Sequence, residues 1–296
     1  PIKPPGGIAG FAAVNSVRSP HDFPHRARAL RFGADAAGAK HALFMEVQLS
    51  EITFKADAAR KLYSARFSVL ALVKNEKGEV VRRVSQDYPI QGKLERLQSL
   101  KKGSLDFTRT FSLPAGRYIL ETVVHDAEAD KTSVQRGDLT VPAVGKGIAV
   151  SNLAIIKRLD PSRPATTGED RPLMTTDGRI VPNLGETITA GPKTTLSFYL
   201  AIYPQGGAQD RPRLTVELLQ NGEVVSRGEA EAPSPDSQGR INYIAGIPTS
   251  SLRSGAYEIR VTVKQGEAQT EERASFTINN PDYVDGSEAA EIKTTK

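Results

Sequence analysis

The 296-residue chain contains no cysteine, no tryptophan and no apolar stretch of the roughly 18 residues that a membrane helix needs. Without cysteine there can be no disulfide, no thiolate nucleophile and no Cys-ligated zinc or iron–sulfur site. The lack of a long apolar run leaves no candidate for a membrane-spanning helix within this sequence. Without tryptophan, and with most Tyr and Phe expected to face inward, a sugar-binding platform of exposed rings is disfavoured.

The charged residues are nearly balanced and are spread along the chain. There are 39 Lys and Arg against 34 Asp and Glu, which gives a formal charge of +5. A nucleic-acid-binding protein concentrates its basic residues on one face or in one segment. Here the densest cluster is short: Arg26, Arg28 and Arg31 in "HRARALRF". We therefore expect no nucleic-acid partner.

The length of the chain and the positions of its Pro- and Gly-rich segments predict two domains. At about 150 residues per domain, 296 residues suffice for two separate cores. Residues 1–27 are rich in Pro, Gly and small side chains, which predicts an extended lead-in, and the start at Pro1 without a signal-peptide pattern suggests a processed product or a fragment. We expect the boundary within Val141–Gly147. This gives domains at 28–144 and 145–280 and a flexible, polar tail at 281–296.

Apolar residues at every second position predict strands. Two early segments show this spacing: Leu43, Met45, Val47 and Leu49, then Phe67, Val69, Ala71 and Val73. Asn75–Gly78 predicts a hairpin turn after the second segment, since Asn and Gly tolerate a positive φ. A short connecting helix is expected in "KLERLQSLKKG", where Leu residues recur every three positions and Gly103 ends the pattern.

The second half of the chain repeats the first. "FSLPAGRYILETVVHD" is matched by "IPTSSLRSGAYEIRVTVKQ", and Gly116 and Tyr118 lie at one common offset from Gly255 and Tyr257. The preceding hairpin "VKNEKGEVV" likewise returns as "LLQNGEVVS". The same order and similar spacing indicate an internal duplication.

The duplicated pattern predicts an all-β fold. A strand that is apolar on one side must cover that side with a second layer, and the apolar residues in the second copy share one face: Tyr257, Ile259, Val261 and Val263. Many short strands joined by hairpins favour two stacked antiparallel sheets. We therefore predict two tandem immunoglobulin- or fibronectin III-like antiparallel β-sandwiches, with Tyr118 and Tyr257 in structural roles like the tyrosine corner of such folds.

The histidines nominate no metal site. His21 and His25 flank Asp22, but Pro24 prevents a regular helix from presenting them together, so a plain loop is expected. No residue is predicted to be catalytic, to bind a cofactor or to bind a metal.

Two other motifs are weaker than they look. "HDAEAD" at 125–130 lacks the Gly and Glu of an EF-hand loop, because Lys131 and Gly137 occupy those places, so a solvated hairpin tip is expected. "GKG" at 145–147 lacks the third Gly of a dinucleotide fingerprint, and a linker explains it. The irregular segment 159–187 has no counterpart in the first copy, and a function peculiar to the second domain is expected there.

The order of segments resembles the C-terminal region of bacterial, chiefly acidobacterial, VWFA-related proteins over roughly residues 28–280. The resemblance is carried by "RALRFGAD", "FMEVQLSEITF", "LPAGRYILETVVHD", "LTVP", "VSNLAIIKRL", "RIVPNLGE", "LSFYLAIY" and "LTVELLQNGEVV". It implies export to the periplasm, the cell surface or the exterior. The metal-ion adhesion motif Asp-x-Ser-x-Ser of von Willebrand A domains is missing here, so the resemblance assigns no metal to any residue.

These observations favour a non-catalytic structural or protein-interaction module with protein partners, which could belong to a larger assembly. The alternative is a carbohydrate-binding or cell-surface adhesion module, for which Tyr199 or Tyr203 would have to lie exposed on a flat face. An enzyme whose site is assembled from loops is the third reading, and it requires a polar cleft with carboxylates of perturbed pKa.

Overall fold

The structure is a computed structural model of the chain, and it describes residues 20–143, 145, 147–161, 173–175, 177–206, 210–283 and 293–294. Within this part of the chain, strands dominate and the only helical segments are η1 (Leu94–Arg96) and α2 (Leu97–Leu100), where the short helix was predicted. Neither described helical segment has the length and hydropathy needed to cross a membrane.

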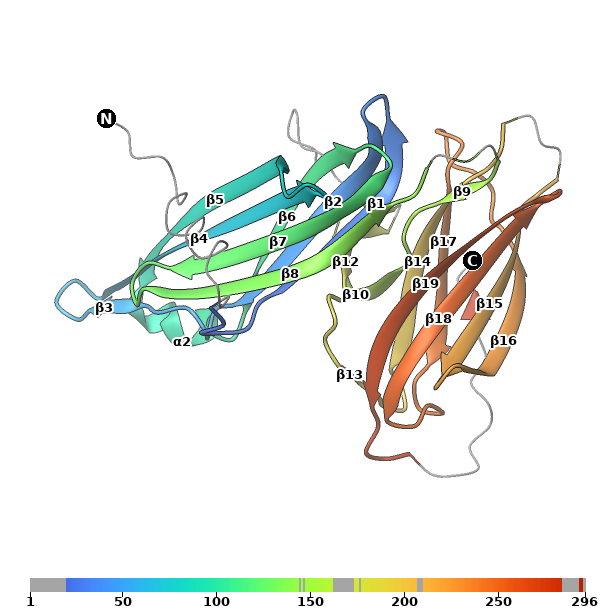
Figure 1. Cartoon of the computed structure of the whole chain (residues 1–296). Coiled ribbons are helices and arrows are strands. Elements are labelled where there is room, and N and C mark those ends of the chain that lie inside the picture. Colours follow the sequence, from blue (N-terminus) through green and yellow to red (C-terminus); the bar gives the residue numbers. More distant parts are fainter. Residues whose placement is uncertain are drawn as a thin grey trace. The chain divides into compact units, whose positions relative to one another are not determined.

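Within the described residues, the first unit comprises residues 20–29 and 36–143. Its strands, from the blue end of Figure 1 onward, are β1 (Arg26–Asp35), β2 (Gly38–Gln48), β3 (Lys55–Asp57), β4 (Leu62–Asn75), β5 (Val80–Lys93), β6 (Ser104–Leu113), β7 (Gly116–Asp126) and β8 (Lys131–Val141). One sheet has the order β1-β2-β6. In the other, β4 is central, with β5 on one side and β3 and β7 on the other, and β8 pairs with β7.

The second unit comprises the described residues from 145 onward and the end of β1, Leu30–Asp35. Its strands are β9 (Ala149–Val150), β10 (Ala154–Asp160), β11 (Met174–Thr175), β12 (Gly178–Pro182), β13 (Ile188–Thr189), β14 (Thr195–Tyr203), β15 (Arg213–Gln220), β16 (Glu223–Glu231), β17 (Ile241–Pro248), β18 (Gly255–Gln265), β19 (Ala268–Asn279) and β20 (Lys293–Thr294). One sheet runs β11-β12-β10-β14-β17-β20, with β9 on β14. The other runs β13-β19-β18-β15-β16.

Each unit has its own apolar core between two sheets. The first core includes the predicted residues Leu43, Met45, Phe67 and Val69. The second core includes the predicted residues Tyr257, Ile259, Val261 and Val263. Pairing between sequential strands is antiparallel, as in β7 with β8 and β18 with β19. The prediction of an all-β chain with two successive antiparallel sandwiches is therefore confirmed.

The duplicated hairpins share a structural irregularity. Gly78 and Gly222 both adopt positive φ, +80° and +85°, and each is followed by the sequence Glu-Val-Val. In each hairpin the pairing register shifts beside these valines, between Val73 and Lys74 in one copy and between Leu218 and Leu219 in the other. The repeated sequence thus encodes a repeated turn and bulge, because an extra residue in one strand requires such a shift.

The two Gly-x-Tyr motifs form matching tyrosine corners. The Tyr118 hydroxyl donates to the Pro114 carbonyl at 3.0 Å, and the Tyr257 hydroxyl donates to the Arg253 carbonyl at 3.1 Å. Each acceptor lies four residues before its tyrosine. Both tyrosines also pack on the core of their own unit. Their predicted structural role is confirmed, since each ring packs inward while its hydroxyl fixes the chain before the strand.

The first copy has a feature that the second lacks: β4, β7 and β8 are apolar on both faces. Behind the main core, Leu70, Leu72, Val123 and Val134 form a second buried cluster, each no more than 3% exposed. Strands buried on both faces read as continuous apolar runs, and "VLALV" in β4 is such a run.

Ion pairs lie on the outward face of the corresponding sheet in both units, and in the first unit Glu121 on β7 pairs with Lys74 on β4 and Arg136 on β8. Glu217 on β15 pairs with Arg260 on β18 at 2.7 Å and lies within 3.9 Å of Arg227 on β16. Ion pairs on a sheet surface suit contact with water rather than with another apolar layer. The two copies therefore share their architecture and the ion pairs on this face, and the first copy adds the buried cluster of Leu70, Leu72, Val123 and Val134.

The structure differs from the predicted domain limits at the start of the chain. Residues 1–19 of the expected lead-in lie outside the described residues, but the chain from Pro20 onward already belongs to the first sandwich. Phe23 is buried in the core, and the backbone of His21 forms an isolated antiparallel β-bridge with Ser133 of β8. The Pro-rich composition concealed these contacts, because single anchoring residues leave no periodic pattern.

Part of the segment 159–187, which was predicted to be irregular, forms strands. Within the irregular segment 159–187, β11 and β12 form a hairpin, and β12 pairs with β10. Gly178 makes the close approach possible, since a Cβ there would lie 2.3 Å from the Asp160 carbonyl oxygen. Residues 162–172 and 176 of this segment lie outside the described part of the chain.

Residues 30–35 belong with the second unit because their polar groups bond there. The Arg31 amide donates to the Asn152 side-chain oxygen and the Asn152 amide donates to the Arg31 carbonyl, both at 2.8 Å. The Arg31 guanidinium also pairs with Glu272.

In the predicted tail, β20 pairs with β17, so two residues of this segment form part of a sheet.

Candidate functional site

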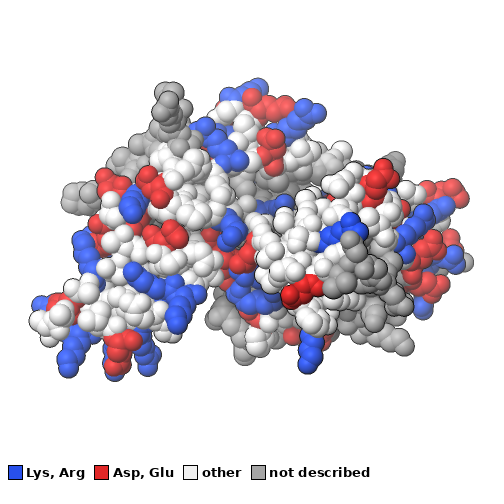
Figure 2. Space-filling model, turned by 90° about the horizontal axis from the view of Figure 1, so that it is seen from below, with Lys and Arg blue, Asp and Glu red and all other residues white. Residues whose placement is uncertain are grey.

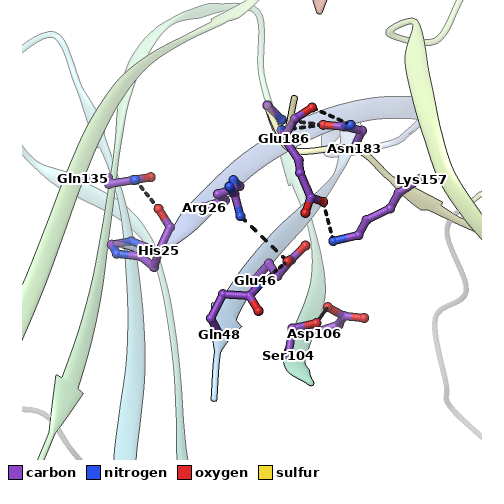
Figure 3. A network of polar contacts seen from close by, with 11 residues as sticks. His25, Arg26, Glu46, Gln48, Ser104, Asp106, Gln135, Lys157, Asn183 and Glu186 are labelled. Atoms are coloured by element: carbon purple, nitrogen blue, oxygen red, sulfur yellow. Dashed lines mark hydrogen bonds and ion pairs between the residues drawn. The ribbon is translucent and has the colours of Figure 1, made fainter. Parts of the chain in front are cut away.

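His25 is a core residue and not part of an open loop. It is 3% exposed, its Nδ1 lies 2.8 Å from the Ser133 hydroxyl and its Nε2 lies 2.9 Å from the Thr122 hydroxyl. Its backbone carbonyl accepts from the Gln135 side chain (Figure 3). Burial, with a smaller contribution from the charge of His21, lowers the pKa of His25 to about 4. The ring is therefore neutral at physiological pH.

The acidic loop after β7 is a hairpin tip that is also hydrogen-bonded to a second loop through Asp126. Asp126 is fully buried and accepts from the Thr53 amide at 2.8 Å and the Glu128 amide at 2.9 Å. Hydrogen bonds from Lys55 and then Arg66 lower the pKa of Glu128. The expectation of a fully solvated tip was wrong for Asp126, because this carboxylate joins two loops.

Tyr199 does not meet the condition for a sugar-stacking face. It is 1% exposed, and its hydroxyl donates to the Asn242 side-chain oxygen at 2.8 Å. Burial raises its pKa above the ordinary value for tyrosine. Tyr203 is half-buried and its hydroxyl donates to the Phe32 carbonyl. Both hydroxyls are thus engaged in hydrogen bonds within the protein.

Among the described residues, no group of three or more His, Asp or Glu side chains is arranged to hold a metal ion. In "GKG", Lys146 lies outside the described residues, and Gly147 adopts a φ of +138°. Figure 2 shows Lys and Arg interspersed with Asp and Glu over the visible face, as expected for a charge spread along the sequence.

A surface groove of about 580 Å³ lies in the first unit, where β4 begins and β5 ends. We call it the basic groove, and it is lined by Arg60, Lys61, Leu62, Lys93, Leu94 and Glu95. Leu62 pairs with Lys93 across the two strands, and the Leu94 amide donates to the Lys61 carbonyl at 2.9 Å. The backbone of both walls is therefore fixed by hydrogen bonds.

The groove combines an apolar base with a positive rim. Leu62 and Leu94 are half-buried, whereas the four charged side chains are exposed. Three of these four are basic, and Glu95 is the single acid. Arg60 is positioned by Asp57, whose carboxylate accepts the Arg60 amide at 2.9 Å and lies 3.7 Å from its guanidinium.

Lys61 ends the turn between β3 and β4. Its φ is +53°, a conformation that Asp130 and Asn221 also adopt in the turns of other hairpins. Sequence reasoning missed the groove, since Arg60 and Lys61 lie about thirty residues from Lys93 and each pair looks like an ordinary polar stretch.

No protein-family model and no curated protein matches the chain. Among solved structures, the fibronectin(III)-like modules of CbhA from Clostridium thermocellum match at 11% identity over 87% of this chain and 95% of that chain, with a TM-score of 0.21. A chimeric titin Z1Z2 tandem carrying an exogenous GRGDS peptide from fibronectin matches at 12% identity over 86% and 100%, with a TM-score of 0.22. At these values neither likeness supports an inference about function.

Proposed function

We propose that the chain is a non-catalytic protein-interaction module and that the basic groove binds an acidic, extended segment of a partner protein. The observation that carries this proposal is the pairing of two half-buried leucines with three exposed cations around one groove. An apolar side chain of the partner would occupy the base, while its carboxylates would face Arg60, Lys61 and Lys93. Charge complementarity of this kind increases the association rate and selects among partners.

We further propose that the module belongs to an exported bacterial protein of the VWFA-related type and acts within a larger assembly. The order of sequence segments supports this membership, and export follows from the resemblance alone. Recovery of the native chain from the periplasm or the culture medium, together with a partner, is the expected result of fractionating a source cell. Recovery only from the cytoplasm would contradict the export proposal and leave the groove proposal standing.

The groove proposal is tested with a labelled peptide that carries one leucine among glutamates. Fluorescence anisotropy measures its binding to the full chain, to Lys61→Glu/Lys93→Glu, and to Lys77→Glu/Lys264→Glu. The control pair makes the same change in net charge at two exposed lysines outside the groove. We expect the groove variant to bind about tenfold or more weakly, because two exposed ion pairs contribute roughly 1–2 kcal/mol together.

Salt dependence adds a second measurement. Binding of the unchanged chain should weaken between low and physiological ionic strength, since exposed charges are screened over about 8–10 Å. Equal losses in both double variants would show that only net charge matters, and the assignment to the groove would then be abandoned.

A further inference from the structure

Among the described residues, β17 pairs along its whole length with the strand on one side and over only two residues with the strand on the other. It pairs with β14 over eight residues, from Ile202 opposite Ile241 to Thr195 opposite Pro248. On its other side, within the described part of the chain, it pairs only with β20, through Ala245 with Thr294 and Gly246 with Lys293.

The core fixes the shape of this strand. Ile241, Tyr243, Ala245 and Ile247 are each no more than 1% exposed, and all four belong to the core of the second unit. Of the remaining four positions of β17, Asn242, Ile244 and Pro248 are half-buried and Gly246 is buried. The strand is therefore a preformed template, which reduces the entropic cost of adding another strand beside it.

The same position is an edge in the first copy. β6 pairs with β2 over ten residues and ends the three-stranded sheet β1-β2-β6. A sheet edge offers a row of backbone donors and acceptors that can pair with another extended segment. The duplication thus placed an edge at this position twice, and in the second unit a C-terminal segment of the chain has been added to it.

We propose that the β17 edge is a strand-acceptor site and that its occupant in a second copy of the protein is the same C-terminal segment, Lys293–Thr294, exchanged between chains. The segment already pairs antiparallel with Ala245 and Gly246 within one chain, so a second copy offers identical backbone chemistry. Exchange of an identical element between copies is a low-cost route to association, because no new interface has to be created. The inference does not depend on the basic groove, which lies in the other unit.

The test mixes full-length chains at natural isotope abundance with ¹⁵N-labelled chains. In both, a photo-crosslinking benzoylphenylalanine replaces Lys293. After irradiation, mass spectrometry identifies the crosslinked peptide and the isotope content of each of its two halves. A matched protein carries the crosslinker at Lys264, an exposed position on β18. We expect crosslinks from position 293 to residues 241–248, with a mixed-isotope fraction that rises with protein concentration.

Each outcome decides one part of the proposal. Crosslinks to 241–248 that never mix isotopes would overturn exchange between copies. Crosslinks that avoid 241–248, or that match those from position 264, would overturn the edge as the acceptor site. Either failure leaves the peptide-binding result at the basic groove unchanged, so the two proposals are distinguishable.

Discussion

At the scale of single residues, several polar side chains do structural work that their sequence context conceals. His25 lies among hydroxyl groups inside the first core, and Asp126 is fully buried beneath two loops. A buried polar group is tolerated when its hydrogen bonds are made, and losing one partner then costs roughly 1–3 kcal/mol. The motifs "HDFPH" and "HDAEAD" are therefore better explained by internal bonding than by metal chemistry.

His25 predicts how the stability of the first unit depends on pH. Because its pKa is about 4 in the folded chain and near 6.5 when unfolded, the unfolded state binds more protons between these values. Stability should therefore fall as the pH is lowered from about 6.5 towards 4, by at most about 3 kcal/mol from this residue. Urea unfolding at several pH values measures the effect.

The matched comparison uses His25→Gln and His21→Gln, since His21 is exposed. The His25 variant should lose less stability on acidification than the unchanged chain, whereas the His21 variant should keep most of the loss, because burial lowers the pKa of His25 more than the charge of His21 does. Parallel pH profiles for the unchanged chain and the His25 variant would show that the buried imidazole does not control this dependence.

At the scale of elements, the duplicated hairpin joins local sequence to architecture. In each copy a glycine at positive φ closes the turn, and the register shift follows within the next few residues. No other atoms lie within 4 Å of a Cβ built on Gly78 or Gly222. Backbone conformation alone therefore explains the choice of glycine at both turns.

This gives a prediction for three alanine substitutions. Gly78→Ala and Gly222→Ala should each destabilise their own unit by about 1 kcal/mol, because alanine disfavours positive φ. Gly137→Ala is the control, since Gly137 also has open space around its Cβ position but does not adopt positive φ. Chemical denaturation of each variant measures the difference. Equal effects at all three positions would show that conformation is not the cause.

Strand positions were predictable because alternation is local, and so were the tyrosine corners, whose hydroxyl acceptors lie four residues away. The burial of both faces of β4 was not, although Leu70 and Leu72 were visible in the sequence, because the covering of a sheet is a tertiary property. The basic groove and β20 were missed for the same reason. Each depends on segments that are distant in sequence and carry no periodic signal.

At the scale of the whole molecule, the chain is two cores in series built from one ancestral pattern. The copies keep their strand order, turns and tyrosine corners, and both carry ion pairs on the outward face of the corresponding sheet, which in the first copy also holds a buried apolar cluster.

The most direct test of this account is hydrogen exchange of the full chain, measured by mass spectrometry in two core variants. Leu43 and Ile259 are both fully buried, one in each core, and their replacement by alanine should cost about 2–5 kcal/mol. We predict that Leu43→Ala accelerates exchange in β2, β4 and β7 while β14, β15 and β18 keep their protection, and that Ile259→Ala does the reverse. Faster exchange across both sets of strands from either substitution would contradict the division into two separate cores.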